Sequence, residues 1–465
     1  MAIVLPYTAE ISDLADSTIT ASADLADSAS RWTATLSPTL RGDGALVGLA
    51  LPPSAAFFSA LFGIWQSGAT ALLLDTALKP DERQRVCNFA GLSCVICVSD
   101  DNWPTTMLTA PDKEDAAITL HTARLTAGGL GLTTSGTTGT PKIVMLSAEA
   151  IEARIRSNLD IIGHETLSRT LQTLSLTFGH GLIGSALTTL FAGGRLVLPA
   201  RGPVLAMKLG PIIDEHAISF LTSVPSFWHM PLKFSPRPIS SSLQRVHVGS
   251  APLAAHAWTS IANWCGVPVH NCYGMTETAN WVAMMSSEQG VQDGLVGESI
   301  DGEFSVDRVT GEVWVRTPGL MDGYLGQREL SAQVLKDGWY KTGDTGSLGE
   351  DGSLLLTGRS VEQINRAGSK VSPSEVDMLV EGHPDVVQAC AFAQSDEVGG
   401  EAVAVAVVLR EGATAGSAEL AKWCGEKARA VLVPQHWYFV SSLCRNDRGK
   451  LDRQGQCRLL ARVDG

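Results

Sequence analysis

Short apolar runs alternate with longer amphipathic segments through roughly the first 300 residues of the chain. The apolar runs have strand length and predict buried strands at residues 45–51, 71–74, 92–98, 195–198, 244–248 and 267–270. The intervening segments show helical periodicity, for example at residues 81–89, 149–159 and 211–216. Such alternation predicts an α/β fold with largely parallel sheets.

The pattern of apolar and turn-forming residues changes after residue 297. Short strands at 312–316 and 353–356 stand among glycine turns, which predicts a small β-rich unit up to residue 357. We therefore expect a large N-terminal domain, residues 1–358, made of stacked, mainly parallel α/β sheets plus this β-rich unit.

A second change follows residue 359 and predicts a smaller, mobile α+β domain over residues 359–465. Ser372-Pro-Ser-Glu375 has the form of a capping box with proline at the first helical position, so we expect a helix to about residue 381. Apolar strands are expected at 386–393 and 402–409, and a further helix at 417–431.

Composition and charge narrow the range of possible functions. The 465 residues include 35 Lys and Arg against 48 Asp and Glu, a net charge of −13, which argues against a nucleic-acid binder. The nine cysteines are an odd number, typical of reduced thiols, and we interpret the Cys94 and Cys97 pair as part of a buried strand. We find neither a signal peptide nor a membrane span, and expect a soluble, cytoplasmic protein.

One loop has the chemistry of a phosphate site. Leu132-Thr-Thr-Ser-Gly-Thr-Thr-Gly-Thr-Pro-Lys142 combines turn-forming residues, hydroxyl donors and a lysine, which suit polyphosphate oxygens. It is not a Walker motif, because Pro141 and Ile143 stand where that motif needs glycine and serine or threonine. A P-loop kinase or GTPase is therefore disfavoured.

This loop resembles the signature loop of the adenylate-forming superfamily, which includes acyl-CoA synthetases, nonribosomal peptide synthetase adenylation domains and luciferase. Ile143 departs from the glycine usual there. Segments similar to the family's other motifs follow in family order: 244–253 beside adenine, 271–277 for adenine and metal, 311–316 and 319–324 leading to the ribose, 339–344 for the ribose, Gly358-Arg359 at the hinge and Gly449-Lys450 near the C-terminus.

The resemblance implies which residues bind ATP. Those around the β- and γ-phosphates would be Thr134, Ser135, Gly136, Thr137, Thr138 and Lys142. Those around the adenosine and α-phosphate would be Gly249, Ser250, Ala251, Asn271, Cys272, Tyr273, Gly274, Met275, Thr276, Asp344 and Arg359.

Chemical reasoning assigns a role to each reactive group. Tyr273 offers an aromatic face to adenine, and the two oxygens of Asp344 can accept both ribose hydroxyls. Glu277 is the hard oxygen ligand that Mg²⁺ requires beside phosphates. Lys450 can neutralise charge that develops between a carboxylate and the α-phosphate. We name Lys450, Thr276, Glu277 and His180 as catalytic candidates.

The expected acid-binding pocket contains Phe178, Gly179, His180, Ser223, Trp228, Gly249 and Trp281. Amino-acid-activating relatives commonly carry aspartate where Gly179 stands, so a carboxylic acid without an α-ammonium group is favoured. His180 resembles the pocket histidine of aryl- and acyl-CoA synthetases. The aromatic residues fit either a pocket wall or the hydrophobic core.

The resemblance implies a carboxylate–thiol ligase that alternates between two domain orientations. We expect it to use ATP and Mg²⁺, to activate a small carboxylic acid, and to present Gly368 and Ser369 to the thiol arm. Val361 stands where the family usually has its hinge Asp or Lys. No carrier domain follows in the sequence, so CoA is the first choice of acceptor and the phosphopantetheine of a separate carrier protein the second. A non-catalytic adenylate sensor is the alternative from another class.

Overall fold

The computed structural model of the chain describes residues 4–38, 40, 45–92, 94–98, 103–108, 128–134, 142–200, 203–359, 364–366, 369–396, 400–428, 430–446 and 451–461. Predicted residues that lie outside these ranges are Ser135, Gly136, Thr137, Thr138, Val361, Gly368 and Lys450. Within the described part, no helix is long and apolar enough to cross a membrane.

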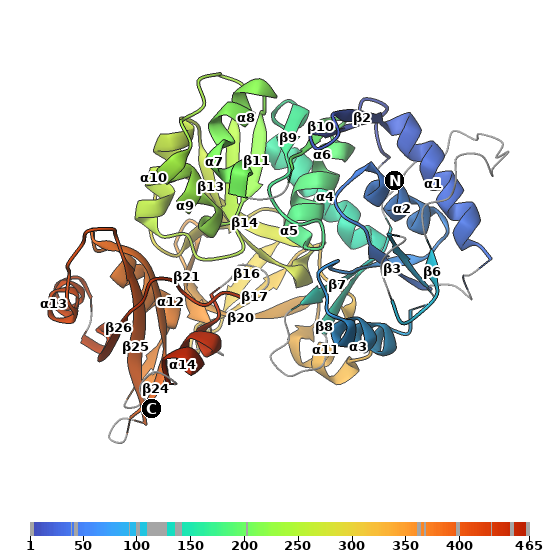
Figure 1. The fold of residues 1–465 in the computed structure, drawn as a ribbon. Coiled ribbons are helices and arrows are strands. Elements are labelled where there is room, and N and C mark those ends of the chain that lie inside the picture. The colour runs from blue at the N-terminus through green and yellow to red at the C-terminus, as the bar shows by residue number, and fades with distance from the viewer. Residues whose placement is uncertain are drawn as a thin grey trace.

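The larger sheet has 14 strands and runs through the middle of the molecule (Figure 1). Its spatial order is β16 (Glu303–Val306), β17 (Glu312–Arg316), β20 (Trp339–Leu348), β21 (Leu354–Arg359), β15 (Leu295–Ser299), β14 (Asn280–Ser286), β13 (Val269–Met275), β12 (Arg245–Gly249), β11 (Phe220–Ser223), β9 (Arg169–Leu171), β10 (Arg195–Leu198), β1 (Glu10–Asp13) and β2 (Thr18–Ala21), with β19 (Leu335–Lys336) beside β20. The run from β13 to β1 is parallel, as the apolar pattern predicted.

A second sheet of seven strands lies on the N-terminal side. Its order is β18 (Gly323–Tyr324), β8 (Lys142–Leu146), β7 (Leu130–Thr134), β4 (Thr70–Leu73), β3 (Leu46–Ala50), β5 (Cys94–Cys97) and β6 (Met107–Leu108). The segment predicted to bind phosphate connects β7 to β8, which pair antiparallel with Thr134 opposite Lys142. Cys94 and Cys97 are buried in β5 with free thiols, so the strand interpretation of that pair is confirmed.

Helices fill the space between the two sheets. The inner helices are α1 (Ser22–Leu36), α2 (Ala55–Gln66), α4 (Ala148–Ile162), and a continuous helix made of α5 (Gly179–Gly181), the π-helical η2 (Leu182–Leu187) and α6 (Thr188–Phe191). One core cluster joins side chains such as Trp32, Phe62, Ile151 and Leu187 to strands of both sheets. The sheets are thus stacked through a shared apolar layer.

Other helices cover the outer faces. They are α3 (Pro80–Ala90), α7 (Pro203–Met207), α8 (Leu209–Glu215), α9 (His229–Phe234), α10 (Ala255–Cys265) and α11 (Arg328–Val334), with one-turn 3₁₀ segments η1 (Thr166–Ser168), η3 (Pro225–Trp228) and η4 (Thr276–Thr278). A second core cluster lies under α8 and α10 and includes Ile213, Trp258 and Trp264.

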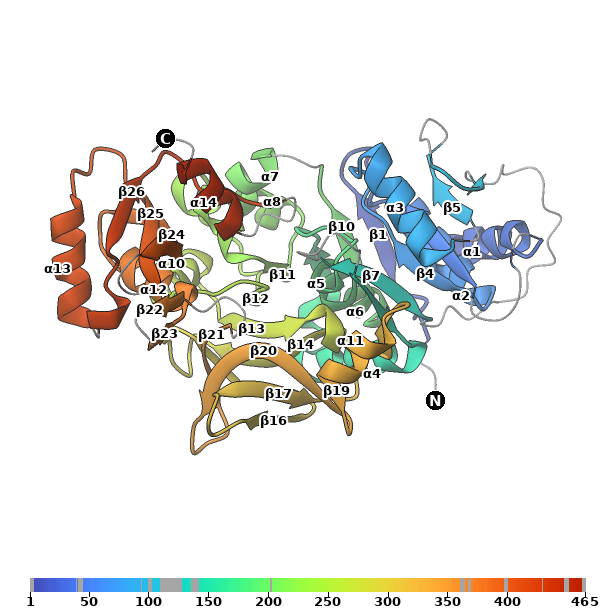
Figure 2. The ribbon, with the colours of Figure 1, turned by 90° about the horizontal axis from the view of Figure 1, so that it is seen from below.

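The strands of the predicted β-rich segment belong to the large sheet. β15 pairs with β14, and β21, β20, β17 and β16 follow outward in that order. The large sheet curls strongly at this end (Figure 2). The turns that glycine was expected to make are present, for example at Gly338 and Gly352, whose φ angles are +77° and +83°.

The strands after Arg359 form their own five-stranded sheet, on the side of the molecule away from the seven-stranded sheet in both views (Figures 1 and 2). It consists of β23 (Ser369–Val371), β22 (Ile364–Arg366), β25 (Gly400–Leu409), β24 (Val386–Asp396) and β26 (His436–Phe439). Helices α12 (Pro373–Glu381) and α13 (Ser417–Lys427) pack on one face, with η6 (Ala430–Leu432) following, and α14 (Arg453–Ala461) packs on the other.

Two details of this small domain differ from the sequence prediction. Helix α12 begins at Pro373 as expected, but the capping box is not formed, since the Ser372 hydroxyl caps no backbone N–H. That hydroxyl instead lies so close to Gly358 that a Cβ there would come within 2.0 Å of it. Helix α13 ends at Lys427, because Ala428 has an extended backbone, whereas the periodicity predicted residue 431.

Candidate active site

The polar residues of the site gather at the carboxyl ends of neighbouring parallel strands. His180 follows β9, Thr222 is the second-last residue of β11, Ser250 follows β12 and Glu277 follows β13. Those four strands are adjacent and parallel, so their carboxyl ends form one edge. Ligands of open α/β sheets bind at such an edge.

The first cluster joins the predicted adenine and ribose residues. The Tyr273 hydroxyl donates to Asp344 Oδ2 at 2.6 Å, and Arg359 Nε donates to Asp344 Oδ1 at 2.8 Å. Tyr273 and Asp344 are buried, whereas about half of the Arg359 side chain is exposed. Burial, and then the charge of Asp344, raise the pKa of Tyr273 well above its usual range, so the phenol stays a neutral donor.

Asp344 retains capacity for a ligand in this arrangement. An ionised carboxylate has about four lone-pair sites, and Tyr273 and Arg359 use one on each oxygen. The backbone N–H of Asp344 is fixed by the Thr342 hydroxyl at 3.0 Å. The carboxylate is therefore held rigidly and can still accept two hydroxyl donors, as its predicted ribose role requires.

The second cluster surrounds Glu277. The Tyr324 hydroxyl donates to Glu277 Oε1 at 2.8 Å, and Lys142 Nζ lies 4.7 Å from the centre of the Tyr324 ring. The Tyr340 hydroxyl in turn donates to the Tyr324 hydroxyl. The predicted phosphate lysine and metal carboxylate, from different sheets, thus meet at one tyrosine.

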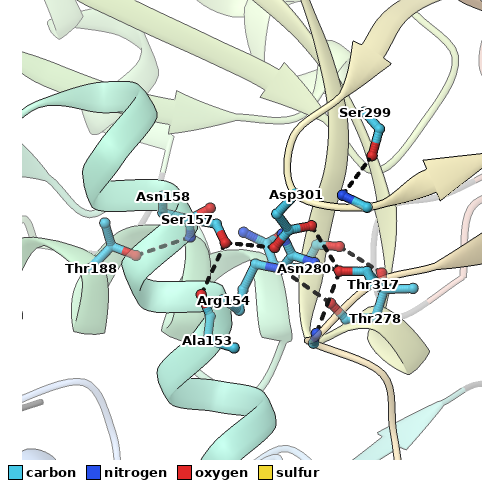
Figure 3. A network of polar contacts seen from close by, with 12 residues as sticks. Ala153, Arg154, Ser157, Asn158, Thr188, Thr278, Asn280, Ser299, Asp301 and Thr317 are labelled. Carbon is cyan, nitrogen blue, oxygen red and sulfur yellow. Dashed lines mark hydrogen bonds and ion pairs between the residues drawn. The ribbon is translucent and has the colours of Figure 1, made fainter. Parts of the chain in front are cut away.

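A buried ion pair supports the turn that carries Glu277 (Figure 3). Arg154 is fully buried and pairs with Asp301 at 2.9 Å, donates to the Thr317 hydroxyl at 2.8 Å, and donates through Nε to the carbonyl of Thr278. Ser157 also donates to Asp301. The cost of burying the guanidinium is offset by these partners, and the end of η4 is fixed to α4.

The residues present fit a magnesium ion held mainly by its substrate. The described residues contain no group of three or more His, Cys, Asp or Glu that could hold a metal. Mg²⁺ characteristically binds through one or two carboxylates together with substrate phosphates. Glu277, with Oε1 occupied by Tyr324, supplies a carboxylate of this kind beside the phosphate lysine.

The third cluster surrounds His180. Its Nδ1 lies 2.7 Å from the Ser250 hydroxyl and its Nε2 lies 2.6 Å from the Thr222 hydroxyl. Its ring makes an edge contact with Trp281, with centroids 5.2 Å apart. His180 is buried and stands in the first turn of a helix whose next segment is π-helical, a distortion frequent at functional sites.

Behind Trp281 a row of rings continues into the sheet. The ring centre of His247 lies 4.7 Å from that of Trp281, and that of His270 lies 5.2 Å further on. Arg245 donates to His247 Nε2 at 2.8 Å, so the proton of the neutral ring is on Nδ1. Burial, then Arg245, lower the pKa of His247 well below its usual value, and burial lowers the pKa of His270 to about 3.

Two predicted pocket residues face elsewhere. Successive side chains of a strand point to opposite faces, and Thr222 faces His180, so Ser223 faces away. Ser223 accepts a hydrogen bond from Trp228 Nε1 at 2.7 Å, and the Trp228 ring packs edge-on against Trp264 in the second core cluster. The polar groups of both residues are therefore used within the core rather than beside His180.

Backbone geometry explains the glycines of the adenine motifs. A Cβ at Gly249 would come within 2.5 Å of the Cys272 carbonyl, and one at Gly274 within 2.2 Å of the Asn280 carbonyl. Ser250, next in the chain, has φ +65°. Close approach of β12, β13 and β14 therefore requires glycine at both positions.

The remaining predicted residues are distributed around these clusters. Asn271 donates to the Leu295 carbonyl at 2.8 Å, so its side chain ties β13 to β15. Cys272 is buried in β13, and Ala251 is exposed in the turn after Ser250. Met275 ends β13 and Thr276 begins η4, whereas Phe178 precedes α5, which begins at the buried Gly179.

Lys450 lies outside the described residues, but both flanks of its motif are anchored. Arg445 and Leu451 form an antiparallel bridge, and the Asp452 N–H donates to the Cys444 carbonyl at 2.9 Å. Arg453 pairs with Asp377 of α12 at 2.6 Å. The chain on both sides of residues 447–450 is therefore fixed to the small domain.

Sequence reasoning missed four residues that the structure brings to the site. They are Thr222, Arg154, Tyr324 and Tyr340. Tyr324 and Tyr340 stand in the family-like motifs 319–324 and 339–344, so a signal existed for both. Thr222 and Arg154 stand in ordinary apolar or helical surroundings, and only tertiary structure reveals their contacts.

Comparison with known proteins places the chain in a family. The model of AMP-binding enzymes matches residues 18–128 and 132–325, and that of the AMP-binding enzyme C-terminal domain matches residues 375–450. A probable CoA ligase of Humulus lupulus is 32% identical over 339 residues, covering 70% of this chain and 65% of that protein. An oxalate–CoA ligase of Arabidopsis thaliana is 31% identical over 386 residues, covering 78% and 72%.

The fold has solved counterparts of nearly the same extent. The o-succinylbenzoate CoA synthetase of Bacillus subtilis, in complex with its acyl-adenylate intermediate, superimposes with a TM-score of 0.82 at 22% identity, covering 96% of this chain and 94% of that one. With both family models matched in order along this architecture, the chain belongs to the AMP-binding, adenylate-forming enzymes.

Proposed function

We propose that the protein activates a carboxylic acid with ATP, forming an acyl-adenylate and pyrophosphate, and then transfers the acyl group to the thiol of CoA. The observation that carries this proposal is the joining of the adenine and ribose residues in one buried cluster, Tyr273–Asp344–Arg359, beside the Glu277–Tyr324–Lys142 cluster. Named CoA ligases among the relatives support the same activity.

In the first step a carboxylate oxygen attacks the α-phosphorus and pyrophosphate leaves with the bond electrons. Such chemistry depends on positioning and charge neutralisation rather than on covalent catalysis. Asp344 orients the ribose, and Lys142 and the 135–138 loop hold the β- and γ-phosphates. Lys450 would neutralise charge between the carboxylate and the α-phosphate. When bound, Mg²⁺ at Glu277 supplies further neutralisation of the phosphates.

In the second step the thiol attacks the acyl carbon and AMP leaves. The predicted contact face for the thiol arm includes Gly368 and Ser369, the latter beginning β23. Rotation of the small domain after Arg359 would exchange this face for Lys450, which is a hinge motion needing few residues.

The acid side of the site favours an uncharged acyl group near His180. Ser250 and Thr222 occupy both ring nitrogens of His180 with hydroxyl groups, and Gly179 offers no carboxylate for a substrate ammonium. This supports an aryl or acyl acid rather than an α-amino acid as substrate.

The test is exchange of radiolabelled pyrophosphate into ATP, run over a panel of aliphatic, aromatic and dicarboxylic acids. We expect exchange that depends on the acid and does not require CoA, and strong suppression by Lys450→Ala. Thioester formation is then measured with CoA and with a phosphopantetheinylated carrier protein. A preference for the carrier would favour the second acceptor, and no exchange with any acid, despite ATP binding, would favour the adenylate sensor.

A further inference from the structure

Tyr324 stands where the two sheets meet. Strand β18 pairs antiparallel with β8, with Tyr324 opposite Val144, and the Leu325 N–H donates to the Ile143 carbonyl at 2.9 Å. The Tyr324 N–H is itself held by the Ser331 hydroxyl at 2.9 Å. The ring is therefore fixed beside the start of β8, where Lys142 lies.

The two faces of this side chain serve different groups. The aromatic face lies 4.7 Å from Lys142 Nζ, within cation–π distance. The hydroxyl donates to Glu277 Oε1 at 2.8 Å. Glu277 follows β13 of the large sheet and Lys142 begins β8 of the other sheet, so Tyr324 sets the spacing between them.

The Tyr324 hydroxyl also has a second partner. Its oxygen accepts from the buried Tyr340 hydroxyl, which leaves its single proton for Glu277. Among the described residues, Tyr324 binds Glu277 through Oε1, which leaves Oε2 available to a ligand.

We propose that Tyr324 is a positioning residue for magnesium–ATP: it orients the Glu277 carboxylate for the metal and holds Lys142 at the phosphates. This inference rests on the proposed function, because it assumes that Glu277 and Lys142 meet magnesium and phosphate. It assigns to Tyr324 no contact with the reacting atoms.

Three variants separate the two contacts. Tyr324→Phe keeps the ring beside Lys142 and removes the hydroxyl from Glu277, whereas Tyr324→Leu removes both. Tyr438→Phe is the matched control, because its hydroxyl donates to Gln394 within the small domain. Manganese binding is titrated by electron paramagnetic resonance in the presence of α,β-methylene-ATP, whose P–C–P bridge prevents transfer of its adenylyl group. The magnesium requirement of pyrophosphate exchange is measured in parallel.

Loss of a group that orients a metal ligand typically weakens metal binding about 10- to 100-fold. We expect Tyr324→Phe to raise the manganese dissociation constant by about tenfold or more, with the ATP KM at saturating magnesium unchanged. Tyr324→Leu should add a rise in ATP KM of about two- to fivefold, the size of an exposed cation–π contact. Tyr438→Phe should match the wild type.

A manganese dissociation constant in Tyr324→Phe equal to that of the wild type would overturn the proposal. If Tyr324→Phe does not fold, Tyr340→Phe replaces it, since losing the donor that orients Tyr324 should shift the constant in the same direction, and no shift there would overturn the proposal as well. Failure of the proposed function is separate: the wild type would then bind manganese with the ATP analogue yet show no exchange with any acid.

Discussion

The two halves of the candidate site differ in charge: one contains charged groups and the other contains neutral ones. The nucleotide half, which we define as Tyr273, Asp344, Arg359, Glu277 and Tyr324, holds charged groups, and each of its two carboxylates accepts a phenol hydroxyl. Each carboxylate has a hydrogen-bond donor beside it because an unpaired charge is costly to bury.

The acid half, defined as His180, Thr222, Ser250, Trp281 and His247, is built of rings and hydroxyls. His247 is kept neutral by burial and by Arg245. Trp281 Nε1 and His247 Nδ1 are buried without a hydrogen-bond partner among the described residues, which is unusual for buried polar atoms.

The difference matches the needs of the two proposed substrates, ATP and a carboxylic acid. A polyanion needs fixed charges whose positions are set by short hydrogen bonds, so that little reorganisation is needed during reaction. A carboxylic acid whose acyl group is uncharged needs a pocket that adds no competing charge. Substitutions can disrupt each half separately, and they are given from the largest expected effect to the smallest.

The largest effect is expected from the ion pair buried beneath the nucleotide half. Arg154→Met leaves Asp301 buried without its cation and frees the Thr278 carbonyl. Breaking a buried pair typically costs about 3–5 kcal/mol, which denaturant unfolding would measure. Arg156→Met is the control, since its pair with Glu152 is exposed and should change stability by about 0.5 kcal/mol or less. Equal effects of the two variants would contradict this assignment.

Asp344→Asn breaks the nucleotide half directly. Hydrogen bonds to a charged group contribute about 1.5–3 kcal/mol each, so the ATP KM should rise roughly 10- to 100-fold while the KM for the acid stays close to that of the wild type. Steady-state exchange kinetics provide both constants. Asp351→Asn, in an exposed turn, should leave both unchanged. A parallel rise of the acid KM would show that the two halves are not separable.

The neutral rings of His247, in the acid half, and of His270 behind it predict a pH dependence of stability. Because burial depresses the pKa of His270 to about 3 and that of His247 as well, the unfolded chain binds more protons than the folded one below about pH 6.5. The free energy of unfolding should therefore fall as the pH falls below that value, by up to about 1.4 kcal/mol per pH unit for each group.

His270→Gln tests this dependence. The variant should reduce the slope of unfolding free energy against pH between about pH 6.5 and pH 5, whereas His436→Gln, at an exposed position, should keep the wild-type slope. An unchanged slope in His270→Gln would mean that this ring is not kept neutral by the fold.

The smallest effect is expected from Thr222→Val, which keeps the shape of the acid half and removes the hydroxyl from His180 Nε2. A neutral hydrogen bond contributes about 0.5–1.5 kcal/mol, so the acid KM should rise about two- to tenfold with the ATP KM unchanged. Thr222→Ser should restore the wild-type acid KM. A rise confined to the ATP KM would be the opposite of this expectation.

Sequence motifs contain more of the mutually contacting residues of the nucleotide half than of the acid half, for a physical reason. Nucleotide contacts need particular backbone shapes and charges at fixed spacing, so Gly274 and Glu277 stand in one seven-residue motif, 271–277. The strand alternation that separates Thr222 from Ser223 is also a local rule, but which face meets His180 is decided by the packing of helix 179–191 against β11.

The fold was predictable where one periodicity dominated. Strand β10 matched its apolar run at Arg195–Leu198, and helix α4 extended the predicted 149–159 by only a few residues. The β-rich segment was predicted, but its continuity with the large sheet was not, because the pairing between β14 and β15 depends on contacts that no local pattern encodes. The capping box at Ser372 failed for a similar reason, since Gly358 brings another chain segment against that hydroxyl.

The central claim, attack of a carboxylate on the α-phosphorus, is tested most directly by isotope transfer. A substrate acid identified by exchange is labelled with oxygen-18 in its carboxylate and turned over with ATP and CoA, and the products are analysed by mass spectrometry. Attack on the α-phosphorus followed by loss of AMP from the acyl carbon predicts one labelled oxygen in AMP. Label in inorganic phosphate, or AMP without label, would contradict it.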